Sequence, residues 1–150
     1  MDTIDKQIIS LLQDDAKITI KEIAHRLNLS TTPIFDRIKK LEENKVITGY
    51  HAQIDKKALD LSLMVFCAIT LKEHHANYLK KFERDIINLD EVLSCYHLGG
   101  NSDYLLQVVV SDISSYHVFI TQKLANVENI ATVQSSFVMK EIKEGKLPVF

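Results

Sequence analysis

The stretch IKEIAHRLNLSTTPIFDRIKKL, residues 20–41, decides the fold of the first part of the chain. Asn28 tolerates the left-handed backbone that ends a helix, and Ser30 suits the N-cap of the next one. Pro33 falls in the first turn of that second helix, where its missing N–H costs little. Apolar residues recur at helical spacing on both sides of this turn: Ile23, Ala24 and Leu27 before it, and Ile34, Ile38 and Leu41 after it. We therefore predict two short helices joined by a tight turn.

A third amphipathic helix is predicted over residues 2–13, because Ile4, Ile8, Leu11 and Leu12 form one stripe. Three such helices can close a small core of their own. This arrangement is typical of a helix-turn-helix, which holds its second helix out rigidly enough to enter the major groove of DNA. An ordinary pair of packed helices is the alternative interpretation of residues 20–41.

The distribution of charge along the chain favours DNA binding by the N-terminal helices. Residues 17–40 carry six basic side chains and only two acidic ones, whereas the whole chain has a formal net charge of −2. A basic region on a mildly acidic protein is what contact with phosphates requires.

Length and composition limit the number of domains and the class of protein. A chain of 150 residues holds one medium domain or two small ones. The longest apolar run has the length of a strand rather than of a membrane span, and the acidic, polar start MDTIDKQ is no secretory signal, so we expect a cytoplasmic protein. Cys67 and Cys95 are expected to be reduced thiols. His74 and His75 are adjacent rather than four apart, and we predict neither a metal site nor a cofactor.

The pattern changes after the three helices. Residues 46–54 (VITGYHAQI) alternate around Gly49 as a small hairpin, or wing, would. From residue 62 the order strand, helix, strand, strand, helix, strand predicts a ferredoxin-like βαββαβ domain, with both helices on one face of an antiparallel sheet. The predicted organisation is α+β: a winged helix-turn-helix domain over 1–54, a linker over 55–61 and a second domain over 62–150.

Both faces of the predicted sheet are apolar. Val65, Cys67 and Ile69 alternate with Met64 and Phe66 in the first strand, and the strand over residues 104–110 shows the same pattern. One layer of helices covers one face only. We expect the other face to meet a second subunit, with Val108 as a trial position for a disruptive charge if it points that way. Cover by the N-terminal helices is the alternative.

The segment LSTTPIFDRIKKLEENKVITGYHAQID resembles the helix-turn-helix and wing of the Lrp/AsnC (feast/famine) transcription regulators. The opening IDKQIISLLQDDAKITIKEIA is similar to the first two helices of that family, and residues 100–104 match its Gly-x-x-Asp-Tyr loop. The resemblance covers nearly the whole chain. It implies a DNA-binding head, a ferredoxin-like effector domain, homodimers and often octamers made of four dimers. It also implies that an amino acid or related metabolite binds between dimers near the glycine loop.

The resemblance implies that residues 31–41 are the recognition helix. Arg37 can contact phosphate or bridge within the head. Asp36 can accept a hydrogen bond from cytosine N4 or pair with Lys40 one turn on, the latter being preferred. The full set of expected DNA-binding residues is Lys21, Ser30, Thr31, Thr32, Phe35, Asp36, Arg37, Lys39 and Lys40.

The glycine loop predicts an effector site. Gly99 and Gly100 let backbone N–H groups approach a carboxylate, and Asp103 can hold an ammonium, which together suit an α-amino acid. A plain β-turn in which Asp103 bonds its own backbone is the alternative. The remaining expected effector residues are Asn101, Ser102, Tyr104, Thr132 and Gln134.

Three classes of function follow. A DNA-binding regulator that responds to a small molecule is favoured. An amino-acid-sensing module whose head binds protein is the alternative. An enzyme is not expected, because the sequence shows no nucleophile, phosphate-loop or metal-ligand pattern.

Overall fold

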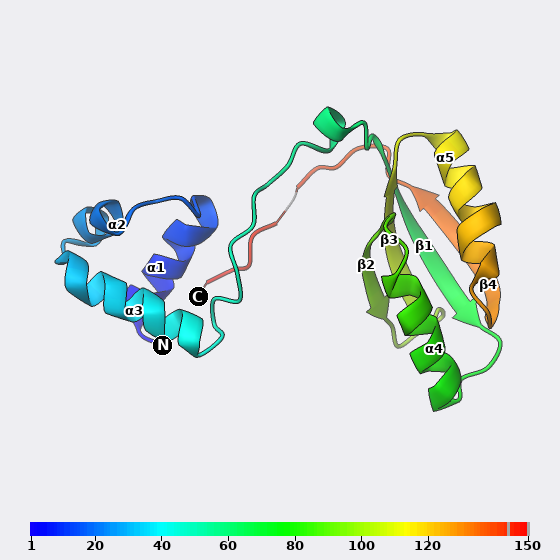
Figure 1. Ribbon diagram of the computed structural model, residues 1–150, viewed down its shortest axis with the longest axis horizontal. Coiled ribbons are helices and arrows are strands. Elements are labelled where there is room, and N and C mark those ends of the chain that lie inside the picture. Colours follow the sequence, from blue (N-terminus) through cyan, green and yellow to red (C-terminus); the bar gives the residue numbers. More distant parts are fainter. Residues whose placement is uncertain (144, 150) are drawn as a thin grey trace. The chain divides into compact units, whose positions relative to one another are not determined.

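The computed structural model describes residues 1–143 and 145–149 (Figure 1). The chain divides into two compact units, residues 1–53 with 143–150 and residues 54–142. Each unit has its own apolar core.

The first unit contains the three predicted helices, α1 (Thr3–Asp14), α2 (Ile20–Leu27) and α3 (Thr31–Glu43). Each begins at a polar residue. Asp2 accepts from the backbone N–H of Asp5 at the start of α1, and Thr19 accepts from Glu22 at the start of α2. The buried side chains at the centre of the unit are Ile8, Ile23, Ala24, Ile34 and Leu41.

The turn between α2 and α3 has the predicted geometry. Asn28 ends α2 with a φ of 54°, and its N–H bonds to backbone carbonyls of α2. Ser30 stands at the N-cap of α3, but its side chain makes no capping hydrogen bond.

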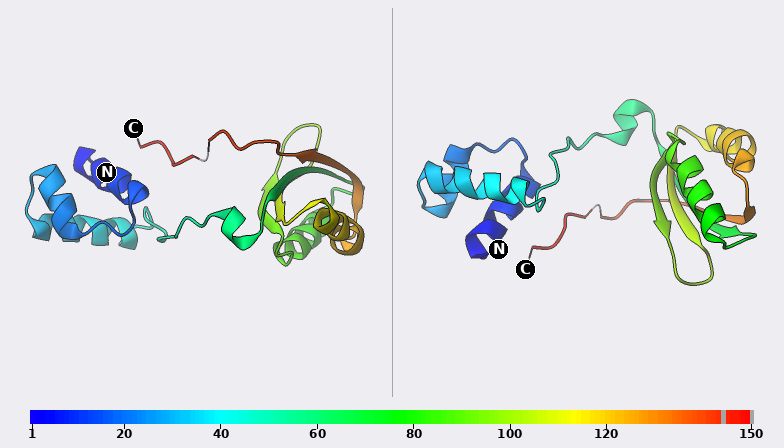
Figure 2. Two further views of the ribbon diagram at one scale, coloured as in Figure 1. Left: turned by 90° about the horizontal axis from the view of Figure 1, so that it is seen from above. Right: turned by 60° about the horizontal axis from the view of Figure 1, so that its bottom comes forward.

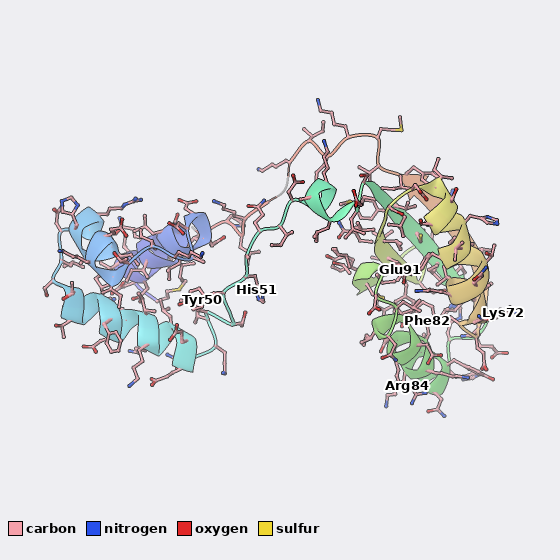
Figure 3. All side chains as sticks on the ribbon, turned by 45° about the horizontal axis from the view of Figure 1, so that its top comes forward. Tyr50, His51, Lys72, Phe82, Arg84 and Glu91 are labelled. Carbon is pink, nitrogen blue, oxygen red and sulfur yellow. The ribbon has the colours of Figure 1, made fainter. Side chains whose placement is uncertain are left out.

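The predicted hairpin over residues 46–54 is absent, because this part of the described chain contains no strand. Lys45 has a φ of 57°, and the N–H groups of Val46 and Ile47 both donate to the carbonyl of Leu41. These bonds close the end of α3 rather than starting a ladder, and an isolated two-stranded hairpin is only marginally stable. Tyr50, labelled in Figure 3, donates its hydroxyl to Glu42 over 2.8 Å.

The second unit is one antiparallel sheet under two helices. The strands are β1 (Leu63–Leu71), β2 (Val92–His97), β3 (Tyr104–Val110) and β4 (Ile130–Phe137), in the order β2-β3-β1-β4. The helices α4 (Ala76–Ile87) and α5 (Ile113–Val118) lie on one face, as the left view of Figure 2 shows. After α5 the chain continues through a π turn, η2 (Phe119–Lys123), and a 3₁₀ turn, η3 (Leu124–Asn126). A further 3₁₀ turn, η1 (Lys56–Leu59), precedes the sheet. This is the predicted ferredoxin-like topology.

The register assigns every strand residue to a face. Cys67 pairs with Leu106 and Val65 pairs with Val108, so these four side chains lie under the helices, where all are fully buried. Val108 therefore points into the core of one chain, which makes it the wrong place to test a contact between subunits. The opposite face, here called the open face, includes Met64, Phe66, Ala68, Tyr96, Leu105, Gln107 and Val109.

Candidate functional site

Most of the predicted DNA-binding side chains share the exposed surface of α3. Ile34 and Leu41 anchor the helix in the core, and at 100° per residue their exposed neighbours turn outward. Phe35 is 53% exposed although it is large and apolar. The exposed side chains of the predicted recognition helix are Thr31, Thr32, Phe35, Asp36, Lys39 and Lys40; Lys21 and Ser30 are also exposed.

Arg37 bridges within the head. Its Nη1 atom donates to Asp2 Oδ2 over 2.7 Å and to Asp5 Oδ1 over 2.6 Å. The hydrogen bond to Asp5, followed by that to Asp2, raises the pKa of the Arg37 guanidinium. The pKa of Asp2 is lowered, chiefly because its carboxylate accepts from the backbone N–H of Asp5 and then because it accepts from Arg37. The bridge joins α3 to the start of α1. Sequence reasoning missed its two acidic partners, although acids three apart before an apolar stripe are the signal of a helix start.

The preferred pairing of Asp36 with Lys40 is wrong. Among the residues that the structure describes, neither side chain forms an ion pair, whereas Lys39 lies 3.8 Å from Glu43 at the same spacing. Asp36 is exposed and free to meet a partner outside the chain. The basic surface also includes exposed Arg26, and it is smaller than the sequence count indicates because Asp2 and Asp5 occupy Arg37.

The glycine loop connects β2 to β3. The N–H of Leu98 donates to the carbonyl of Asp103 over 2.7 Å, and the N–H of Asp103 donates to Ile69 over 2.8 Å. Within residues 1–143 and 145–149, no group accepts from the backbone N–H groups of residues 99–102. Gly99, Gly100 and Asn101 are exposed, and a side chain at either glycine would meet nothing within 4 Å. Space and donors for a small anion are therefore present.

The carboxylate of Asp103 is already engaged. Its Oδ2 accepts from the N–H of Leu71 over 2.7 Å, and its Oδ1 lies 2.9 Å from Nε2 of His74. The Leu71 bond is the main cause of its lowered pKa, and His74 lowers it further. Asp103 thus ties the loop to the end of β1, a role closer to the turn residue of the alternative. Sequence reasoning missed the contact of His74 with the loop, because His74 and Asp103 lie 29 residues apart in the chain.

Tyr104 does not line a surface site. It is 1% exposed, and its ring lies 4.6 Å from the rings of both His97 and Phe82. Its hydroxyl donates to Glu83 Oε1 over 2.8 Å, and burial is the main cause of its raised pKa. This predicted effector residue belongs to the core beneath the loop, because β-strand alternation turns it under the helices.

Thr132 and Gln134 are exposed on the open face of β4. They pair with Thr70 and Ala68 of β1, while Ile69 between them pairs with Tyr104. The loop and these polar side chains therefore lie at the same end of the sheet, on either side of β1. Ser102 is half-buried beside Asp103.

Known proteins match both units. The family model "Winged helix-turn-helix DNA-binding" matches residues 1–48, and "Lrp/AsnC ligand binding domain" matches residues 64–148. The Bkd operon transcriptional regulator of Pseudomonas aeruginosa is 34% identical over 99% of this chain and 97% of its own length. The leucine-responsive regulatory protein of Rhizobium meliloti is 35% identical over 97% of this chain and 93% of its own.

Solved structures match the whole chain. An AsnC family transcriptional regulator from Agrobacterium tumefaciens has a TM-score of 0.94 at 37% identity, covering 99% of this chain and 97% of that one. A transcriptional regulator of Neisseria meningitidis, solved with L-Met, has a TM-score of 0.94 at 32% identity, covering 99% and 96%.

A helix-turn-helix head followed by a ferredoxin-like ligand-binding domain defines a class of transcriptional regulators. The chain belongs to the Lrp/AsnC family. The predicted resemblance is confirmed. In the part of the chain that the structure describes, no cluster of His, Cys, Asp and Glu is able to hold a metal ion, and no helix is long and apolar enough to cross a membrane.

Proposed function

We propose that this protein is a transcriptional regulator that binds duplex DNA through α3 and changes that binding when an amino acid occupies the glycine loop. The observation that carries the first half is the exposed face of α3, which presents polar, aromatic and basic side chains while Ile34 and Leu41 fix the helix in the head. In helix-turn-helix proteins the N-terminal end of this helix meets base edges. Thr31, Thr32 and Phe35 stand at that end.

The roles divide along α3. Lys39 and Lys40 contact phosphates, which fix the register on DNA but carry no sequence information. Lys21 and Ser30, on the neighbouring helix and turn, do the same. Arg37 acts as a positioning residue, because its guanidinium is committed to α1.

The effector is an amino acid. Its carboxylate accepts from the unoccupied N–H groups of residues 99–102. Its ammonium replaces His74 at Oδ1 of Asp103, since His74 is 59% exposed and can swing away while Oδ2 keeps its bond to Leu71. The L-Met bound to the Neisseria regulator and the leucine response of the Rhizobium relative support this class of ligand.

The proposed regulator acts as a homodimer formed through the open face of the sheet. The open face carries Met64, Phe66 and Leu105, and an apolar surface of this kind suits burial against its own copy across a two-fold axis. Thr132 and Gln134 lie on that face, so a second copy, or a second dimer, completes the effector site. Assembly into an octamer would follow from contacts between such dimers.

The experiment is a DNA titration by fluorescence anisotropy, run with each common amino acid at millimolar concentration. We expect at least one amino acid to shift the apparent Kd and to raise the Tm of the free protein, because ligands that bind the native state stabilise it. DNA binding with no amino acid altering either quantity would contradict the sensing half. No salt-dependent DNA binding under any condition would contradict the proposal as a whole and favour a protein-binding head.

A further inference from the structure

Phe35 is the conspicuous side chain of α3. It is 53% exposed, whereas Ile34 next to it is fully buried. The core of the head closes without this ring, which is neither one of its buried side chains nor one of those packed against it. A large aromatic side chain in water at this place calls for a partner outside the chain.

The position of Phe35 on α3 indicates the kind of partner that its ring would contact. Thr31 and Lys39 lie four residues to either side of Phe35 and share its flank of the helix. Both are exposed, and Lys39 and Lys40 bring positive charge to the surface around the ring. A surface that joins an aromatic ring on the first half of a recognition helix to cations on its second half suits duplex DNA, whose phosphates meet the lysines while the ring enters the groove.

The chemistry of the ring narrows the contact further. A phenyl group neither donates nor accepts a hydrogen bond, so it cannot read the polar edges of the bases. The apolar group that the major groove offers is the C5-methyl group of thymine. Asp36 beside it can accept from the amino group of cytosine N4, so the two neighbours would read different bases.

We propose that Phe35 determines specificity by packing against a thymine methyl group in the major groove. This inference rests on the proposed entry of α3 into the groove. It predicts that the protein distinguishes thymine from uracil, which pair identically and differ only in that methyl group.

The test begins with a duplex selected by the wild-type protein from a randomised DNA pool. Each thymine is then replaced in turn by deoxyuridine, and the Kd is measured by anisotropy. For the wild type we expect a loss of about fourfold at one or two positions, the weight of one buried methyl group. Phe35→Ala should bind all versions of the duplex alike. Circular dichroism checks its fold, which the exposure of Phe35 should leave unchanged.

Lys39→Ala is the matched control. It should weaken binding to every duplex but keep the discrimination against deoxyuridine. A wild type indifferent to every deoxyuridine, or a Phe35→Ala variant that still discriminates, would overturn the inference while leaving DNA binding by α3 intact. Failure to select any duplex would overturn the proposed function instead.

Discussion

Leu105→Asp should break the proposed dimer without unfolding the chain. Leu105 lies on the open face of β3, and its neighbour Leu106 is fully buried under the helices. The two adjacent leucines therefore separate the two faces of one strand. If a second copy covers the open face, a charge at residue 105 is fully buried only in the dimer.

The magnitude follows from burial and symmetry. Full burial of a leucine side chain stabilises by about 1.5–3 kcal/mol, and Leu105 is already half-buried in one chain, so covering the rest contributes about 1 kcal/mol. Because a two-fold axis places Leu105 of both copies in the interface, this contribution is made twice. Leu105→Ala should therefore weaken the dimer by about 2 kcal/mol, or roughly thirtyfold in Kd. An unpaired carboxylate costs several kcal/mol more at each copy, so Leu105→Asp should be monomeric at micromolar concentration.

Sedimentation velocity measures the assembly, and circular dichroism measures the fold. Leu106→Asp is the control, because it should unfold the sheet rather than dissociate a folded protein. A Leu105→Asp variant that keeps the wild-type dimer, or a wild type that sediments as a monomer at micromolar concentration, would refute the reasoning.

Three further predictions concern charges. Arg37→Ala should lower the Tm, because α3 loses its tie to α1, yet leave the salt dependence of DNA binding unchanged; a slope flattened by one unit in a salt titration would instead place Arg37 on phosphate. Asp103→Asn should lower the Tm at neutral pH, and because the folded pKa of Asp103 lies below its unfolded value, calorimetry should show the difference closing as the pH falls below about 4. His74→Ala should tighten the binding of the amino acid by removing its competitor for Asp103, and calorimetry showing weaker binding would make His74 a ligand contact.

The sequence predicts this fold well where periodicity carries the information. Alternation in the first strand separates Val65, Cys67 and Ile69 from Met64 and Phe66, and the structure confirms that the first three are buried under the helices. The prediction of a hairpin over residues 46–54 was wrong, because an alternating pattern does not show which strand would pair with it. The N–H groups of Val46 and Ile47 instead donate to the carbonyl of Leu41.

Contacts between distant residues lay outside what periodicity can predict. The bonds from Arg37 to Asp2 and Asp5 and from His74 to Asp103 join segments about thirty residues apart. Helical spacing located Arg37 on α3 but left its partner open. Nothing in the local sequence of the glycine loop indicates that the carboxylate of Asp103 already accepts hydrogen bonds from Leu71 and His74.

The central claim is that the exposed face of α3 binds DNA. Its most direct test is the salt dependence of DNA affinity for the wild type and for the double variant Lys39→Ala, Lys40→Ala, measured by anisotropy on the selected duplex and on a scrambled one. Both lysines are exposed, so the fold should survive. We expect binding to weaken on both duplexes alike, and the slope of log K against log salt to flatten by up to about 2 units. An unchanged affinity and an unchanged slope would remove this face of α3 from the DNA interface and contradict the account.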